Sequence, residues 1–335
     1  MGFGARKNCN LRLGGLPASQ GQSCQARFNT TIMKILVTGS AGLVGNALVS
    51  ELKQVGNTVC RLVRPGTSVE AVRGNEGFDV RWNPETGELG AAAVGADAVV
   101  NLAGASIAHG RWTAERKKEL RGSRVDTTRS LVNALARMAA RPRVLVSASA
   151  IGYYGDRGEE VLKEESAAGY GFLCEVAQEW ETEAVKAEAL GIRVVRLRFG
   201  VILAKEGGAL GQMARPFRFG VGGRIGSGQQ WMSWVGLDDV VAIVRLALEN
   251  GAVRGAVNVV APEPIRNMEF TAALSKTVHR PALFPAPAFA LRLLLGEMAD
   301  ALLLSSTRVV PARLEKLGYR FVQPDLGSVL ESMLS

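Results

Sequence analysis

Histidine is scarce in this chain, which has only His109 and His279 among its 335 residues. A zinc site or a Ser-His-Asp triad would have to use one of the two, so we expect neither, and we expect no metal ion. The four cysteines form no CxxC pair and no metal-ligand spacing. They are Cys9, Cys24, Cys60 and Cys174. We expect Cys60 and Cys174 to be reduced thiols in or near the core.

Long apolar runs are also missing. No segment approaches the roughly 18 consecutive apolar residues of a membrane-spanning helix, and the nearest candidate, 286–295, is interrupted by Pro287 and Arg292. The formal charge is +9, yet no dense basic run carries interleaved aromatics. We therefore expect no membrane and no nucleic-acid partner. A modest positive excess suits an anionic cofactor or substrate. These absences favour a reduced, soluble protein of the cytoplasm.

Residues 1–32 differ from the rest of the chain. They carry four of the basic residues, no Asp or Glu, and no sustained hydrophobic period. An organelle transit peptide would be basic in the same way, but a convincing amphipathic stripe is lacking here. We expect a disordered extension, or an artefactual one preceding a true start at Met33, and exclude it from the fold.

A glycine-rich turn follows the first apolar run. Residues 35–37 are a short apolar run that predicts a buried strand, and the apolar spacing after Ala47 predicts a helix. Gly39, Gly42 and Gly45 lie between the two. Such a turn lets backbone amides and the helix N-terminus approach a pyrophosphate, which predicts dinucleotide binding. A turn in which the glycines bind no ligand is the alternative.

The end of the second predicted strand, 58–63, bears on which nucleotide is bound. NAD enzymes place Asp or Glu there for the ribose 2′-hydroxyl, whereas NADP enzymes place Arg against a 2′-phosphate. Here Val63 is followed by Arg64, and no carboxylate occurs before Glu70. The position predicts NADPH, with a solvated loop arginine as the alternative.

Predicted strands and helices alternate along the rest of the chain. We predict strands at 78–82, 96–104, 143–149, 192–197 and 256–260, and helices at 113–139, 172–190, 238–250, 267–278 and 287–304. This alternation predicts an α/β fold, a Rossmann-like doubly wound parallel sheet over 33–204. A small C-terminal α/β lobe over 205–335 would hold the substrate, because glycine-rich loops begin there.

Several strings give the chain a family resemblance. They are TGSAGLVG at 38–45, VVNLAGASI at 99–107, SASAIGYYG at 147–155, VVRLRFGVIL at 194–203, GSGQQWMSWV at 226–235 and GEMADALLLSSTRVVPARLEKLGYRF at 296–321. Together they resemble the epimerase family of atypical short-chain dehydrogenase/reductases, NAD-dependent epimerase/dehydratase-like proteins with a C-terminal domain of unknown function. That domain would span about 285–332.

The resemblance implies an NADP(H)-binding site. The residues implied to contact the cofactor are Gly39, Ser40, Gly42, Leu43, Val44, Gly45, Val63, Arg64, Leu102, Ala103, Gly104, Glu119 and Arg124. A solvated helix charge is the alternative for Glu119.

The chain departs from active short-chain reductases in one respect, since it contains no YxxxK motif. The positions expected for that pair read Phe172 and Val176. Ser149 matches the usual catalytic serine, and Tyr153 or Tyr154 could supply a proton beside Arg157. The alternative is a Tyr-Tyr-Gly turn whose rings pack against the edge of the sheet.

Two functions remain open from the sequence. The first is an NADP(H)-dependent oxidoreductase or epimerase-like enzyme acting on an unidentified small molecule. The second is an NADP(H)-binding sensor or interaction protein without turnover, which the missing YxxxK favours. We expect a monomer or a homodimer.

Overall fold

The computed structural model of the chain describes residues 32–65 and 77–334. The predicted extension over 1–32 therefore lies outside the described residues, apart from Ile32. Residues 32–334 belong to one compact unit.

An eight-stranded sheet forms the centre of this unit. Its order is β12 (Gly255–Val259), β8 (Arg193–Phe199), β6 (Val144–Ala150), β5 (Ala98–Asn101), β1 (Lys34–Thr38), β2 (Thr58–Val63), β3 (Gly77–Asn83) and β4 (Glu88–Leu89). All neighbours pair in parallel except β3 and β4. The predicted Rossmann-like α/β fold is confirmed.

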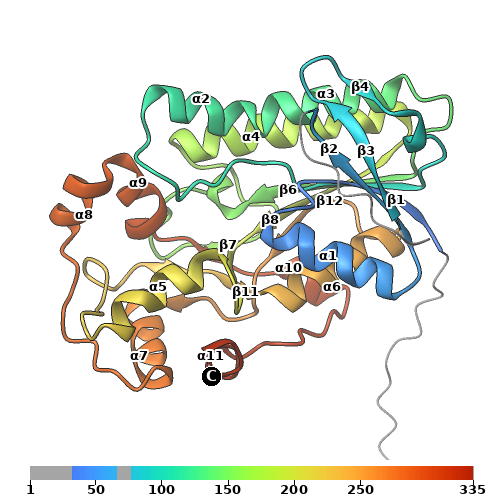
Figure 1. The fold of residues 1–335 in the computed structure, drawn as a ribbon. Coiled ribbons are helices and arrows are strands. Elements are labelled where there is room, and N and C mark those ends of the chain that lie inside the picture. The colour runs from blue at the N-terminus through green and yellow to red at the C-terminus, as the bar shows by residue number, and fades with distance from the viewer. Residues whose placement is uncertain (1–31, 66–76, 335) are drawn as a thin grey trace, which may run out of the picture. The chain divides into compact units, whose positions relative to one another are not determined.

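Helices cover both faces of the sheet, as Figure 1 shows. On one face lie α1 (Leu43–Gln54) and α6 (Leu237–Glu249), and on the other lie α3 (Val125–Ala136) and α4 (Phe172–Val185), which η3 (Lys186–Leu190) extends. Side chains of a strand alternate between faces, so Ile35 and Val37 join the core under α1 and α6, whereas Leu36 joins the core under α3. Each side chain buried in this way stabilises the fold by about 1.5–3 kcal/mol.

The strand order reverses between β1 and β5, because β2 lies on one side of β1 and β5 on the other. In open parallel sheets, ligands bind outside the carboxyl ends of the strands at such a reversal. The glycine-rich turn leaves β1 at this edge, and the segment beginning at Leu102 leaves β5 beside it. We therefore expect the ligand-binding site of this fold at this edge of the sheet.

Two predicted helices are interrupted. The one expected over 113–139 is divided into α2 (Ala114–Gly122) and α3, because Ser123 and Arg124 bond to the loop after β5: the amide of Ala105 donates to Ser123 Oγ at 3.0 Å and Arg124 donates to the Ala105 carbonyl at 2.9 Å. The one expected over 287–304 breaks at Gly296, whose φ is +63°. It becomes α8 (Ala288–Leu295), α9 (Glu297–Ala299) and the π-helical η4 (Asp300–Leu304).

The remaining elements follow the main sheet. Three two-stranded pairs are β9 (Val201–Leu203) with β11 (Trp234–Gly236), β10 (Trp231–Met232) with β13 (Ile265–Arg266), and β7 (Val161–Leu162) with β14 (Arg308–Val309). The helices are α5 (Gly208–Arg218), α7 (Asn267–Thr277), α10 (Ala312–Lys316) and α11 (Leu326–Leu334), with short 3-10 turns η1 (Ala91–Ala93) and η2 (Ile151–Tyr153). β12 lies within the predicted C-terminal lobe over 205–335 in the sequence and pairs with β8 in the main sheet.

Asp239 lies in the first turn of α6, where its side chain is fully buried. Its carboxylate accepts hydrogen bonds from the Tyr319 hydroxyl and from the amides of Val322 and Gln323. It therefore ties the segment after α10 to α6.

Cys60 and Cys174 are both buried and free, as predicted. Among the described residues, no helix is long and apolar enough to cross a membrane.

Candidate functional site

The turn between β1 and α1 is closely packed. Gly39 has φ +65°, and a Cβ built there would lie 2.4 Å from the carbonyl oxygen of Leu102. A Cβ on Gly45 would lie 2.2 Å from the Gly39 oxygen. These two positions require glycine for the turn itself. Gly42 is exposed, and a Cβ there would meet only the Gly39 oxygen, at 3.3 Å. A side chain at Gly42 would thus chiefly occupy space outside the protein, where a ligand could lie.

The start of α1 is open to an anion. Its N-cap, Gly42, provides no side-chain cap, and the first turn holds no acidic residue. Leu43, Val44 and Gly45 form that turn, and amides in the first turn of a helix have no intrahelical partner. Together with the helix dipole, such amides attract phosphate. Ser40 is buried in the preceding turn.

A buried hydrogen-bond network fixes this turn against the end of β5. The Thr38 hydroxyl donates to the Asn101 side-chain oxygen at 2.7 Å and accepts from the amides of Leu102 and Ala103. The Asn101 amide group donates to the Thr128 hydroxyl at 2.8 Å. Sequence reasoning missed Thr38 and Asn101, although a polar residue ending each of two apolar strands was a visible signal. The network holds Gly39 close to Leu102, and the family resemblance implies that both contact the cofactor.

A segment from the later half of the chain reaches the same turn. A Cβ on Gly208, the first residue of α5, would lie 2.9 Å from the Leu43 side chain, and one on Gly207 would lie 3.6 Å from it. Leu43 is therefore in contact with the loop between β9 and α5. This places part of the predicted substrate lobe beside the predicted cofactor turn.

Val63 and Arg64 lie one strand away. Val63 ends β2, and Arg64 follows it exposed to solvent. Its guanidinium forms no hydrogen bond or ion pair with any described residue, and the neighbouring residues 66–76 lie outside the described part of the chain. Arg64 is thus exposed and unpaired at the position where NADP enzymes place an arginine against the 2′-phosphate.

Arg124 is a partly buried cation at this edge. Its guanidinium donates to the carbonyls of Leu120 and Ala105 at 3.1 and 2.9 Å, and no carboxylate of a described residue pairs with it. A Cβ on Gly104 would lie 3.1 Å from the guanidinium carbon, so glycine lets the loop after β5 approach it closely. Burial, with a smaller contribution from the charge of Arg116, lowers the pKa of Arg124 to about 10. The side chain therefore stays charged at neutral pH.

Glu119 does not join this group. It is exposed on α2 and pairs with Arg116 three residues earlier. This is the solvated helix charge that the sequence left as the alternative.

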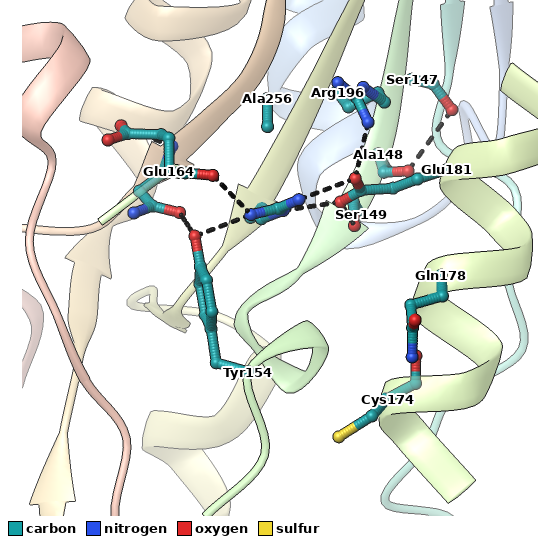
Figure 2. A network of polar contacts seen from close by, with 12 residues as sticks. Ser147, Ala148, Ser149, Tyr154, Glu164, Cys174, Gln178, Glu181, Arg196 and Ala256 are labelled. Atoms are coloured by element: carbon teal, nitrogen blue, oxygen red, sulfur yellow. Dashed lines mark hydrogen bonds and ion pairs between the residues drawn. The ribbon is translucent and has the colours of Figure 1, made fainter. Parts of the chain in front are cut away.

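The candidate catalytic residues Ser149 and Tyr154 lie in a buried polar network, which Figure 2 shows. The Ser149 hydroxyl donates to Glu181 at 2.7 Å. The Tyr154 hydroxyl donates to the Asn258 side-chain oxygen at 2.7 Å and accepts from Arg198 at 2.8 Å. Tyr154 is 0% exposed, and burial raises its pKa to about 12 despite the Arg198 charge. In this geometry its proton is held inside the protein rather than presented to a substrate.

Glu181 and Arg198 form the centre of the network, and sequence reasoning missed both. Arg198 is 3% exposed and makes two hydrogen bonds to the Glu181 carboxylate, at 2.7 and 2.9 Å. Although burial opposes its charge, the hydrogen bonds and charge of Glu181 raise the pKa of Arg198. Arg196 adds a second cation to Glu181 at 2.9 Å. Two arginines two residues apart in an apolar strand were the available signal, since both point to one face.

Tyr153 is the candidate with a free hydroxyl. It is partly buried, and its hydroxyl has no hydrogen-bond partner among the described residues. The guanidinium carbon of Arg198 lies 3.5 Å from the centre of its ring. Arg157, the cation we expected beside it, instead pairs with Glu160 and donates to the Ala167 carbonyl at 3.0 Å. The charge near Tyr153 is thus that of Arg198.

No cluster of His, Cys, Asp and Glu within the described ranges 32–65 and 77–334 has the geometry of a metal site. His109 is exposed in the loop after β5. The site therefore consists of a glycine turn, unpaired arginines and a tyrosine at the carboxyl edge of the sheet.

Comparisons with known proteins agree with this geometry. The model of the NAD dependent epimerase/dehydratase family matches residues 35–260, and that of a domain of unknown function, DUF1731, matches residues 286–333. An epimerase family protein of Mycobacterium leprae is 38% identical over 299 residues, which is 88% of this chain and 94% of the relative. A chloroplastic epimerase family protein of Arabidopsis thaliana, described as an SDR39U1 homolog, is 40% identical over 86% of this chain and 83% of its own length.

A solved structure is also similar. The human epimerase family protein SDR39U1 (isoform 2), crystallised with NADPH, superposes with a TM-score of 0.78 at 31% identity. The match covers 90% of this chain and 99% of the human one.

Proposed function

Because this chain belongs to the NAD-dependent epimerase/dehydratase family, we propose that it binds NADP(H) and acts as an oxidoreductase or epimerase-like enzyme on a carbonyl- or sugar-containing small molecule. The observation that carries the cofactor part is the open turn between β1 and α1, with exposed, unpaired Arg64 one strand away. The human relative with NADPH supports it.

The cofactor would lie along the carboxyl edge of the sheet. The first-turn amides of α1 would hold its pyrophosphate, Arg64 its 2′-phosphate, and Arg124 with the 102–104 segment would flank its other half. When bound, NADP(H) supplies or accepts a hydride at the nicotinamide ring.

Tyr153 carries the catalytic part of the proposal. In a carbonyl reduction its hydroxyl would give a proton to the substrate oxygen, and it would regain one from solvent. The Arg198 guanidinium over its ring favours the anion left behind. Ser149 gives its only proton to Glu181, so it could contact a substrate only through a lone pair.

A second function has a specific observation in its favour. Both Ser149 and Tyr154 use their hydroxyl protons inside the protein, and the chain lacks YxxxK. An NADP(H)-binding sensor or interaction protein without turnover would have this property.

The cofactor proposal is tested by thermal unfolding of the full chain with NADPH and with NADH. A ligand that binds the folded state stabilises it by mass action, so the shift reports affinity. We expect the chain to bind NADPH more tightly than NADH. Arg64→Ala should raise the Kd for NADPH by about 10- to 100-fold, since hydrogen bonds to charged groups are worth about 1.5–3 kcal/mol. Arg143→Ala is the control, because Arg143 is an exposed arginine at the opposite, amino end of β6. Indifference to both nucleotides would refute the cofactor and both functions.

The catalytic part is tested by a screen of carbonyl compounds with NADPH, followed by substitution. Turnover that survives Tyr153→Phe would reject Tyr153 as the proton donor. Reproducible NADPH binding with no turnover across the screen would favour the sensor.

We also propose a cytoplasmic protein, monomeric or homodimeric, whose partner is a small molecule rather than nucleic acid or membrane. The free thiols of Cys60 and Cys174 support a reducing compartment. Imaging of a fluorescent fusion and light scattering of the purified chain test the two parts.

A further inference from the structure

Two arginines lie on one tryptophan in the C-terminal part of the chain. The guanidinium carbon of Arg308 in β14 lies 4.3 Å from the centre of the Trp231 ring, and that of Arg266 in β13 lies 4.5 Å from it. Trp231 belongs to β10, so three short strands supply the three side chains. Both distances are within the range of a cation–π interaction.

The two cations differ in their partners. Arg266 makes two hydrogen bonds to the Glu159 carboxylate, at 3.2 and 2.9 Å, and a third to the Gln229 carbonyl. The Trp231 indole N–H donates to Glu159 as well, at 2.9 Å. Glu159 is thus already engaged by Arg266 and Trp231.

Arg308 has no such partner. Its Nε is buried without a hydrogen bond, and its terminal nitrogens bond to no described residue either. In the described part of the chain, three other arginines have a buried, unpartnered Nε. Those three, Arg116, Arg196 and Arg245, all bind a carboxylate through a terminal nitrogen. Arg308 alone of the four stacks on a ring and makes no hydrogen bond or ion pair with a carboxylate of a described residue, although its charge helps to lower the pKa of Glu159.

An unpaired guanidinium on a rigid platform suits one chemical class of ligand. Its planar set of N–H donors matches the oxygens of a carboxylate or phosphate, and stacking fixes its orientation before the ligand arrives. Two positive charges with a single carboxylate leave this cluster with an excess of one positive charge, which favours an anion over a neutral group.

The cluster is joined to the loop that follows Tyr153. The Thr307 hydroxyl donates to the Gly155 carbonyl at 3.0 Å, and the Ser306 hydroxyl donates to the Gly158 carbonyl at 2.7 Å. Glu159 lies on the same loop. A molecule bound at Arg308 would therefore lie near the loop that follows the candidate proton donor.

We propose that Arg308, held on Trp231, binds an oxyanion of the substrate, a carboxylate or a phosphate. This inference rests on the proposed function, because it names the class of small molecule on which that function would act.

The experiment uses the full chain, with and without saturating NADPH. Thermal unfolding is followed during titration with inorganic phosphate, or with malonate as the carboxylate probe, and chloride keeps the ionic strength constant. Arg308→Gln removes the charge, Arg308→Lys keeps the charge but not the planar donors, and Trp231→Phe keeps a ring but not the bond to Glu159. Arg320→Gln is the matched control, an exposed arginine of the same C-terminal region without a partner among the described residues.

We expect one probe to raise the melting temperature of the wild type and of Arg320→Gln by a few degrees at about ten times its Kd. Arg308→Gln should lose this shift, and Arg308→Lys and Trp231→Phe should keep part of it. The probe that acts identifies the oxyanion as phosphate or carboxylate.

Three results would overturn the proposal or separate it from the proposed function. An unaltered anion response in Arg308→Gln, with its NADPH shift intact as evidence of folding, would refute it. So would a wild type that responds to neither probe beyond the chloride control. An Arg308-dependent anion shift in a protein that NADPH does not stabilise would refute the cofactor and leave the anion site standing.

Discussion

Arg124 gives the sharpest test of the cofactor site, because it is a partly buried cation that pairs with no carboxylate of a described residue. We consider Arg124→Met, which removes the charge and keeps an unbranched apolar side chain. The variant loses the hydrogen bonds to the carbonyls of Leu120 and Ala105. It also removes the penalty that burial imposes on the guanidinium.

The two effects nearly cancel in the free protein. Burial and the charge of Arg116 lower the pKa of Arg124 to about 10, about 2.5 pH units below its ordinary value. At about 1.4 kcal/mol per unit, the charged form carries a penalty of at most about 3.5 kcal/mol at neutral pH. Loss of the two hydrogen bonds from this charged donor costs about 1.5 kcal/mol each, at the low end for charged groups, or about 3 kcal/mol together. We therefore expect the free energy of unfolding to change by less than about 1 kcal/mol.

The bound protein should respond differently. An anion beside Arg124 offsets the burial penalty of the guanidinium. The wild type therefore gains binding free energy from this contact, and the Met variant, which has no charge there, does not. We expect Arg124→Met to weaken NADPH binding at least about tenfold, equivalent to about 1.4 kcal/mol. Urea unfolding without nucleotide and calorimetric titration with NADPH measure the two quantities.

A neighbouring arginine provides the control. Arg121, three residues earlier, pairs with Glu175 and Glu179 on α4, and Arg121→Met should leave NADPH affinity unchanged. A loss of more than about 2 kcal/mol of stability in Arg124→Met, with unchanged NADPH affinity, would show that Arg124 is structural and that the reasoning fails.

Two further predictions concern stability. Burial raises the pKa of Tyr154 to about 12, so its neutral form favours the folded state: this contribution, about 2–3 kcal/mol, is complete below about pH 10 and is lost as pH rises towards 12. Urea unfolding at several alkaline pH values should show that the free energy of unfolding falls less steeply with pH in Tyr154→Phe than in the wild type. Equal slopes would contradict the raised pKa of Tyr154. Gly39→Ala should cost more than about 2 kcal/mol, because its Cβ would meet the Leu102 oxygen. Gly56 also has a positive φ, +87°, but a Cβ there would meet no atom within 4 Å, so Gly56→Ala should cost only about 1 kcal/mol of stability. Equal losses of stability in the two variants would argue against the close contact between residue 39 and the Leu102 oxygen.

Much of the fold was predictable from local pattern. The run 58–63 forms β2 as expected, and the glycine turn lies between β1 and α1, because apolar alternation and glycine spacing are properties of a few adjacent residues. The family resemblance is confirmed by the family models and relatives. The break in the helix expected over 113–139 was not predictable, since it depends on bonds from Ser123 and Arg124 to a loop about 20 residues away.

The candidate site was predictable only in part. The glycines of the turn were predictable from their spacing, and Arg64 was predictable from its position directly after a strand. The states of Ser149 and Tyr154 depend on Glu181 and Arg198, which approach from another helix and strand. Sequence spacing does not reveal that pairing. From the sequence, Ser149 and Tyr154 were therefore predicted to be free to react, whereas both hydroxyls donate hydrogen bonds within the protein. Their catalytic roles stay predictions, as does that of Tyr153.

The arginines show why a net charge says little by itself. Arg198 is buried against Glu181, so its charge is balanced within the protein and serves the fold. Arg64, Arg124 and Arg308 pair with no carboxylate of a described residue, so each is available to an anionic ligand, and at the partly buried Arg124 such a ligand would also offset the burial penalty. Arg64 follows β2, Arg124 bonds to the loop after β5, and Arg308 adjoins the loop after β6. The strands β2, β1, β5 and β6 are successive neighbours in the sheet. A dinucleotide extended along that edge would meet Arg64 and then Arg124. An anionic substrate beyond it would meet Arg308, so we expect each arginine to govern a different affinity: Arg64 the choice of nucleotide, Arg124 its strength of binding, and Arg308 the substrate.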